Sequence, residues 1–264
     1  MVNIAVFEWR RVFATRRGWM AMAAFGLIWL LVLLYIIAPA ARYLSAPETS
    51  GLIDLLIGDR LEALRHWSTP EVALYWLIAL YLLPFFAVII SADQMASDKV
   101  RGTLRYLLLR TSRTELYFGR FLGQSVLMLL LVTVTLASVL ALIGYYNPER
   151  VSLAVKDLPL ILFHIWLVLL PFVAMMALLS LLASSARQAI VYWIIVWIVA
   201  TLVIGYVQRK YGPFPLLDWL LPGSQISSLI KHFSTQAMVL AAIPILHTLV
   251  LLAFGWWSVN RRDL

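Results

Sequence analysis

Six long apolar runs without a single Lys, Arg, Asp or Glu constrain this chain more than any other feature. They cover residues 19–38, 72–92, 121–145, 159–183, 189–207 and 237–259. Each run can cross about 30 Å of hydrocarbon at about 1.5 Å per residue. Lipid offers the backbone no hydrogen-bond partner, so runs of this kind are expected to be helices. We therefore expect an all-α integral membrane protein with a single transmembrane domain over residues 1–264.

The composition agrees with this fold class and excludes others. Charged residues make up 13% of the chain and hydrophobic residues 63%, whereas soluble domains carry about 25% charged residues. A soluble enzyme, a disordered chain and a nucleic-acid-binding domain are therefore excluded, and no nucleic-acid partner is expected. The chain has no Cys, so disulfides, thiol nucleophiles and cysteine metal sites are absent.

The Lys and Arg residues are distributed unequally between the two sides of the membrane. An even number of spans places both termini on one side. The segments on that side hold thirteen Lys and Arg against five acidic residues, while the opposite segments hold eight of each. Because Lys and Arg accumulate in cytoplasmic loops, we expect both termini to be cytoplasmic.

Residues 2–17 have the pattern of an amphipathic helix that lies on the cytoplasmic surface. Val2, Val6, Trp9 and Phe13 fall on one stripe of such a helix. An interfacial anchor explains this pattern, and a helix that also touches a cytoplasmic partner is compatible with it. The next run, residues 19–38, exceeds the 7–15 residues of a signal-peptide core, so we expect a retained first span.

The cytoplasmic loop at residues 93–120 is unusually apolar for a segment in water. It predicts a short helix after Gly102-Thr103 with Leu104, Leu107 and Leu108 on one side. Such a helix could dock in a groove of a partner. Ser112 and Glu115 predict a capping box that starts the helix of the third span. The alternative is positive-inside charge with helix ends packed at the lipid surface.

Two external segments also carry patterns of their own. Residues 39–71 predict an amphipathic helix on the outer surface of the membrane or against the spans. Residues 208–236 are broken by Gly212-Pro213-Phe214-Pro215 and by Pro222-Gly223. They predict short broken helices before the sixth span, as in a partly inserted hairpin, with a plain surface loop as the alternative.

The chain lacks the motifs of a self-contained enzyme. It has no nucleotide-binding loop of the Gly-x-x-x-x-Gly-Lys-Ser/Thr type and no metal-ligand spacing. Apart from Tyr, the ionisable side chains inside the spans are His164 and His247. Structural hydrogen bonding is the expected role of both, and an intramembrane enzyme that uses one of them is the alternative. A non-transporting assembly scaffold is a further alternative.

A series of motifs resembles the permeases of type-2 ABC exporters. Residues 98–104 read Asp-Lys-Val-Arg-Gly-Thr-Leu, followed by Leu107-Leu108, Ser112-Arg113 and Gly119-Arg120. The ending Trp256-Trp257-Ser258-Val259-Asn260-Arg261-Arg262-Asp263-Leu264 is similar to the end of these permeases, and Glu8-Trp9-Arg10-Arg11 and Leu221-Pro222 match the layout more loosely. The chain departs from the family in three places: Asp98 stands where Glu is commoner, Arg120 replaces Lys, and Thr111 replaces Pro.

The resemblance implies the partners of the chain. It implies a second permease copy, most simply in a homodimer, and two copies of a separate ABC ATPase, all set among the lipids of the bacterial cytoplasmic (inner) membrane. ATP and Mg would bind only to that ATPase, so the chain itself would bind no cofactor and catalyse no reaction. The apolar spans suggest a hydrophobic or amphipathic substrate.

The resemblance also implies which residues couple the chain to the ATPase and which line the transport path. Coupling to the ATPase would fall on the loop after the second span, at Asp98, Arg101, Gly102, Thr103, Leu104, Leu107 and Leu108. The N-terminal helix would contribute Glu8, Trp9, Arg10, Arg11 and Phe13, and a second cytoplasmic contact would contribute Ser185 and Arg187. The second and fifth spans would line the path, with Tyr81, Phe85, Tyr192, Trp193 and Trp197 as candidates.

Overall fold

Six helical segments of the computed structural model are long and apolar enough to cross a membrane, which confirms the expected number of spans. The structure describes residues 2–45, 67–213, 217, 219–230 and 240–261, and the regular structure in these ranges is helical. The six segments are Gly18–Leu44, Pro70–Val100, Arg113–Tyr146, Pro148–Leu182, Ala186–Tyr211 and Ala242–Arg261. Most of them extend beyond the apolar runs, because polar residues at both ends continue the helices.

The helices follow one another with short connections. Before the first span lies α1 (Val2–Ala14), and the span itself joins α2 (Arg16–Val32), the π-helix η1 (Leu33–Ile37) and α3 (Ala38–Ser45). The second span, α6 (Pro70–Ser91), leads into the short helices α7 (Ala96–Val100) and α8 (Thr103–Leu108). The remaining elements are α9 (Arg113–Tyr146), η3 (Pro148–Arg150), α10 (Val151–Leu182), α11 (Ala186–Tyr211) and α14 (Ala242–Arg261).

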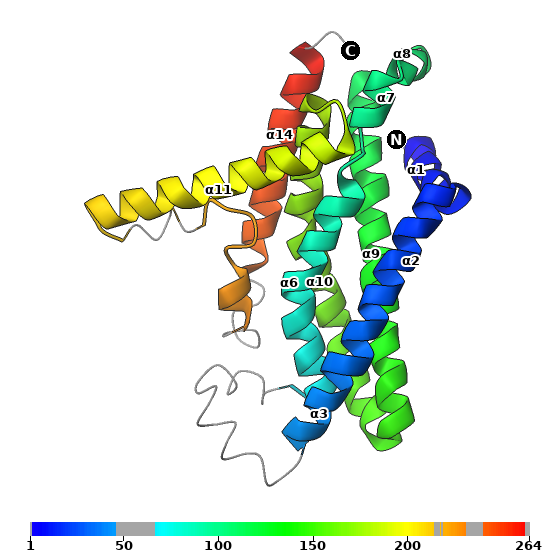
Figure 1. Cartoon of the computed structure of the whole chain (residues 1–264), viewed down its shortest axis with the longest axis vertical. Helices are drawn as coiled ribbons and strands as arrows, with labels where there is room; N and C mark the ends of the chain where they lie inside the picture. The colour runs from blue at the N-terminus through cyan, green and yellow to red at the C-terminus, as the bar shows by residue number, and fades with distance from the viewer. Residues whose placement is uncertain (1, 46–66, 214–216, 218, 231–239, 262–264) are drawn as a thin grey trace.

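Helix α10 occupies the centre of the bundle. Of its most apolar stretch, 78% is buried, and it packs against α6, α9, α11 and α14. A helix that is apolar on all faces is stable only when other helices or lipid surround it. The packing around α10 therefore organises the other spans (Figure 1).

The segments that the sequence places on the cytoplasmic side gather at one end of the bundle. Figure 1 shows α1, α7, α8, the start of α9 and the last turn of α14 together at this end, which we call the terminal end. Helix α9, with 34 residues, runs from the terminal end to the opposite end of the bundle. An even number of spans produces this arrangement.

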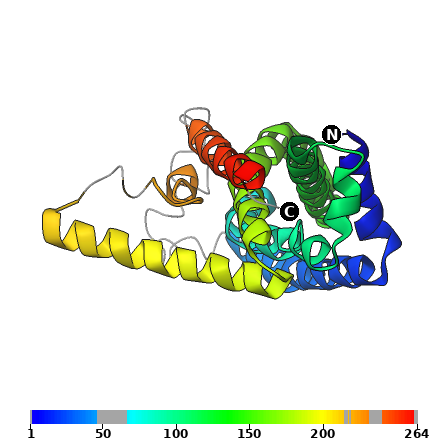
Figure 2. The same cartoon turned by 90° about the horizontal axis from the view of Figure 1, so that it is seen from above.

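Helix α11 differs from the other spans because it leaves the bundle. Figures 1 and 2 show it projecting sideways from the terminal end. The structure describes all of its 26 residues, and among them Ala189 alone is buried. The helix ends at Gly212, whose φ of +91° suits a residue without a Cβ.

The two external segments are described only in part. The predicted amphipathic helix of residues 39–71 falls mainly on residues 46–66, which lie outside the described residues. Its flanks belong to α3 and to the start of α6. In the segment 208–236, residues 208–211 belong to α11 and residues 226–230 are helical. Residues 214–216, 218 and 231–239 lie outside the described range, and so does the start of the predicted sixth span at 237–239.

Candidate functional site

The loop between the second and third spans folds into two short helices. Gly102 separates α7 from α8 with a φ of +70°, a conformation that glycine adopts without a steric penalty. The Ser112 side chain accepts a hydrogen bond from the Glu115 amide, and the Glu115 carboxylate accepts one from the Ser112 amide. The predicted helix after Gly102 and the predicted capping box are both confirmed.

The side chains that this loop exposes differ from those that its pattern suggested. Leu104 is 1% exposed and belongs to the core of this chain. It is therefore positioned to hold α8 in place rather than to contact a partner. Leu107 and Leu108 are partly buried against the same core. The exposed apolar side chains of the loop are Val100 (64%), Tyr106 (74%) and Leu109 (83%).

Three arginines alternate in sequence with these exposed apolar side chains. Arg101, Arg105 and Arg110 are all exposed, and no acidic residue occurs between residues 99 and 114. Tyr and Arg are the residue types that contribute most to protein–protein interfaces. We call Val100, Arg101, Arg105, Tyr106, Leu109 and Arg110 the docking face. It suits an apolar groove with an acidic rim.

A buried charge cluster lies at the terminal end and joins this loop to α1 and α9. Arg120 of α9 is 1% exposed; its Nη2 donates to Asp98 at 2.5 Å and its Nη1 donates to the carbonyl of Gln94. Its Nε lies 3.6 Å from a carboxylate oxygen of Glu8. Arg11 of α1 lies 2.8 Å from Asp93 and 3.5 Å from Asp98. Two guanidinium groups therefore meet three carboxylates.

Glu8 is the least solvated carboxylate of the cluster. Burial raises the pKa of its carboxyl group, and the nearby guanidinium groups of Arg120 and Arg11 only partly offset this effect. The close approach of α1 to α9 requires Gly123, since a Cβ there would lie 3.0 Å from the Cβ of Glu8 and 3.1 Å from the Cα of Ala5. Glu8 therefore serves packing inside this chain and is not available to a partner.

The other predicted residues of α1 lie toward its surface. Arg10 and Phe13 are exposed, Trp9 is half-buried, and the rings of Trp9 and Phe13 are 6.0 Å apart. Exposed Val6 and Phe7 extend the apolar surface. This surface, with Arg10 beside it, has the character of an interfacial anchor.

We call the segment between α6 and α9, residues 92–112, the docking loop. The loop between α10 and α11 lies next to it. Ser185 and Arg187 are exposed, and the Ser185 hydroxyl caps α11 by accepting from the Gln188 amide. Lys99 of α7 donates to the carbonyls of Leu181 and Ala183 at the end of α10. The two cytoplasmic contacts expected from the sequence are thus connected through Lys99.

The candidate path residues lie on two separate helices. Tyr81 and Phe85 are exposed on α6. On α11, Trp197 stacks on Phe172 of α10, and Trp193 packs on Trp197. Tyr192 accepts a hydrogen bond from Gln188. The ring contacts connect the α11 residues to α10, so the path-lining role stays a prediction.

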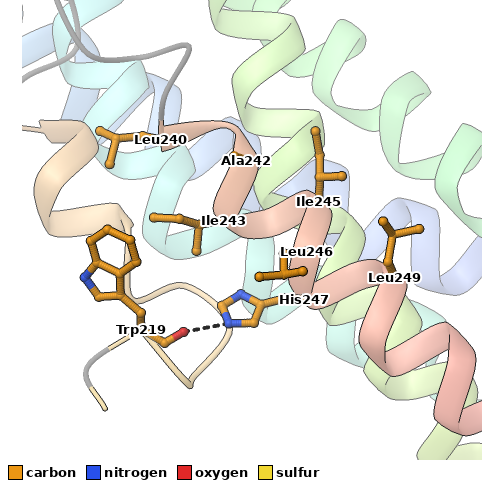
Figure 3. Close-up of a pocket in the computed structure, with 8 residues that line it drawn as sticks. All are labelled: Trp219, Leu240, Ala242, Ile243, Ile245, Leu246, His247 and Leu249. Atoms are coloured by element: carbon orange, nitrogen blue, oxygen red, sulfur yellow. Dashed lines mark hydrogen bonds between the residues drawn. The ribbon is translucent and has the colours of Figure 1, made fainter. Parts of the chain in front are cut away.

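A cavity of about 590 Å³ opens beside the part of α14 farther from the terminal end (Figure 3). Its lining is formed by Trp219, Leu240, Ala242, Ile243, Ile245, Leu246, His247 and Leu249. The His247 Nε2 donates to the carbonyl of Trp219 at 2.7 Å, because a carbonyl oxygen can only accept. This lining suits a hydrocarbon group better than a charged one.

Neither histidine lies in an arrangement that indicates catalysis. His164 is 2% exposed, and its Nδ1 lies 2.9 Å from the carbonyl of Leu160. His247 holds Trp219 as described above. Among the described residues, no group of three or more His, Cys, Asp or Glu side chains could hold a metal ion. The geometry favours structural hydrogen bonding for both histidines.

One comparison with known proteins bears on the whole chain. A family model described as ABC-2 family transporter protein matches residues 2–264. No curated protein matches the sequence.

Proposed function

The chain belongs to the ABC-2 transporter family, and from this premise we propose that it is the permease of an ABC exporter driven by a separate ATPase. Such a subunit needs an outside source of energy, since the sequence has no nucleotide-binding loop. In this proposal two ATPase subunits, which bind ATP and Mg, act on two permease copies. The terminal end, with its excess of Lys and Arg, faces the cytoplasm of a bacterial cell.

The observation that carries the proposal is the docking face. Tyr106 and Leu109 expose 74% and 83% of their surfaces at the terminal end. Exposed apolar side chains gathered on one surface are typical of sites that bind a protein or a membrane. The exposed Arg101, Arg105 and Arg110 of the same segment favour a partner with acidic groups at the rim of its groove. An ATPase that binds here would push on the loop between the second and third spans.

Co-purification tests this proposal directly. We expect the full chain, isolated from its native membrane in mild detergent, to bring an ABC ATPase with it and to hydrolyse ATP. Leu109→Asp and Tyr106→Ala should each weaken this association by about tenfold or more, because central interface residues contribute about 2 kcal/mol or more. Tyr145→Ala is the matched control, since Tyr145 is 81% exposed at the opposite end of the bundle. Retention of the ATPase by both docking-face variants would refute the proposed surface.

A second copy of the chain is the proposed partner of α11. This helix is apolar from Ala189 to Val207, yet its own chain leaves nearly all of it uncovered. In a dimer, α11 of one copy would pack on the other, and Trp193 and Trp197 would then face a path shared by the two permeases.

The proposed cargo is hydrophobic or amphipathic. The spans contain no Lys, Arg, Asp or Glu within their apolar runs, and such charges usually mark a polar or ion-coupled pathway. The apolar cavity beside α14 supports the same class of cargo. Stimulation of ATP hydrolysis by lipids, but not by sugars or charged peptides, in vesicles that contain the complex would test this choice.

A further inference from the structure

We infer that Arg120 is a positioning residue, which fastens the docking loop and α1 to the cytoplasmic end of α9 so that movement of the loop is delivered to α9. The inference deepens the proposed function, and it rests on that function for the source of the movement. Its geometric part, the fastening itself, concerns this chain alone.

The docking loop depends on contacts with the rest of the chain for its position, because its own helices are short. Helices α7 and α8 contain five and six residues, and isolated helices of this length are unstable. Leu104 anchors α8 because its side chain is buried in the core. Lys99 of α7 donates a hydrogen bond to the Leu181 carbonyl at the end of α10. Asp93 pairs with Arg11 of α1, and the Gln94 side chain donates to the Val173 carbonyl of α10. Asp98 supplies the connection to α9: it accepts from the Thr103 hydroxyl at 3.1 Å and from Arg120.

Arg120 contacts two separate parts of the chain from a third. Its guanidinium group binds Asp98 and the Gln94 carbonyl on the loop side, and its Nε faces Glu8 of α1. A guanidinium group has five donors in a rigid plane, so it can serve acceptors in several directions at once. A lysine would offer a single charged point. The three-way contact therefore depends on arginine.

Stability alone does not account for this arrangement. A buried ion pair is often no more stabilising than well-packed apolar residues of similar volume. Apolar packing between α1 and α9 already exists at Gly123. The charges fix the relative positions of α1, α7 and α9. These helices meet at the terminal end of the bundle, which carries the docking face (Figure 1).

The contacts of α9 determine where a displacement of the docking loop is transmitted. Helix α9 packs against α1, α6, α8, α10 and α14, and it spans the bundle in one piece. A loop fixed to α9 through Arg120 transfers its displacement to a helix in contact with most of the bundle. The polypeptide itself joins the loop to the end of α6 and to the first turn of α9. Arg120 adds a contact about two turns further along α9.

Distance measurements on the permease alone test the fastening. The chain has no Cys, so Arg10→Cys in α1 and Val100→Cys in α7 provide two unique sites for spin labels. In phospholipid vesicles we expect one narrow distance between the labels. Arg120→Gln and Asp98→Asn, which break the same contact from opposite sides, should both broaden the distribution, and Arg120→Lys should give an intermediate width. Lys156→Gln, an exposed cation at the opposite end, is the control.

A distribution in Arg120→Gln and Asp98→Asn as narrow as in the control would overturn the inference. In vesicles that contain the ATPase, Arg120→Gln should lower transport by about tenfold, while ATP hydrolysis and the association with the ATPase persist. A proportional loss of transport and hydrolysis would also overturn it. If no ATPase associates with the unmodified chain, the proposed function fails, while the label distances still decide whether Arg120 fastens the loop.

Discussion

Glu8 and Arg120 make unequal contributions to the charge cluster. Arg120 contacts Asp98, Glu8 and the Gln94 carbonyl, and its side chain is fully buried. Arg11 also lies near Glu8 and Asp98, but its side chain is partly exposed. Glu8 is the surplus carboxylate, buried and without a close hydrogen bond from Arg120. Loss of Arg120 leaves three carboxylates with Arg11 as their one cation in the cluster. Loss of the Glu8 charge leaves two guanidinium groups facing two carboxylates.

The stability of the chain should therefore depend on pH through Glu8. Its pKa is raised in the folded state, so its contribution is complete below the ordinary pKa of about 4.3 and is lost as the pH rises through the raised value. Glu8→Gln removes the ionisable group, so the variant does not lose this stability as the pH rises. We expect the variant and the unmodified chain to have similar thermal midpoints near pH 4.5, with the variant more stable near pH 8. Each tenfold change in proton affinity corresponds to about 1.4 kcal/mol.

Thermal unfolding in detergent across this pH range measures the difference. Glu149→Gln, which removes a carboxylate at η3 outside the cluster, is the control for the loss of one acidic side chain. A constant difference between Glu8→Gln and the unmodified chain at every pH would contradict the prediction.

At the residue scale the sequence predicted local features and missed distant partners. The capping box at Ser112 follows from two residues three positions apart, so it was predictable. The meeting of Glu8 with Asp98 and Arg120 joins positions 90 and 112 residues apart in the chain, which no local pattern encodes. A possible signal was the Arg at position 120, directly before an apolar run, since an arginine there needs an acidic partner or the lipid surface.

At the scale of single helices, the spans were predictable because lipid imposes one rule on every residue of a run. The exposed side of α8 was not predictable, since Leu104, Leu107 and Leu108 form a plausible outward face until α9 and the core are in place. They turn inward, and Tyr106 and Leu109 turn outward. Burial of a helical face depends on which neighbour it meets, and that neighbour comes from another part of the chain.

The contact between α14 and α9 depends on a glycine. A Cβ at Gly255 would lie 1.8 Å from the hydroxyl oxygen of Tyr117 and 2.4 Å from its Cζ, and Tyr117 is fully buried. We expect Gly255→Ala to destabilise the fold by about 1–3 kcal/mol or more, because the two helices must move apart. Thermal unfolding in detergent measures this loss.

Gly26 supplies the matched control within the first span. A Cβ at Gly26 meets nothing within 4 Å, so Gly26→Ala should be neutral or stabilise by about 0.5–1 kcal/mol through the lower backbone freedom of alanine. Equal midpoints for Gly255→Ala and Gly26→Ala would show that the α9–α14 contact tolerates a methyl group.

At the scale of the whole molecule, α11 remains without a cover in a single copy of the chain. If a second copy covers it, one cysteine placed on α11 should react with the same cysteine of the other copy. We expect Leu202→Cys, at a position that is 68% exposed, to give a disulfide-linked dimer in membranes on mild oxidation. The absence of native Cys removes any competing reaction.

Val134→Cys provides the comparison for this experiment. Val134 is 54% exposed on α9, a helix that packs inside the bundle of its own copy. The Val134→Cys variant should form no disulfide-linked dimer under the same oxidation. Equal cross-linking at both positions would indicate random collision in the membrane, and cross-linking at neither would contradict the dimer through this part of α11.

The length of α9 determines how far the docking face stands from the lipid. Its 34 residues measure about 51 Å at about 1.5 Å per residue, against a hydrocarbon layer of about 30 Å. About 20 Å of helix is therefore left for the headgroup layers and the water beyond them. The capping box starts the helix at Ser112, beside the docking loop. In the proposed complex, the ATPase would therefore contact the docking face beyond the hydrocarbon layer, without displacing the membrane surface.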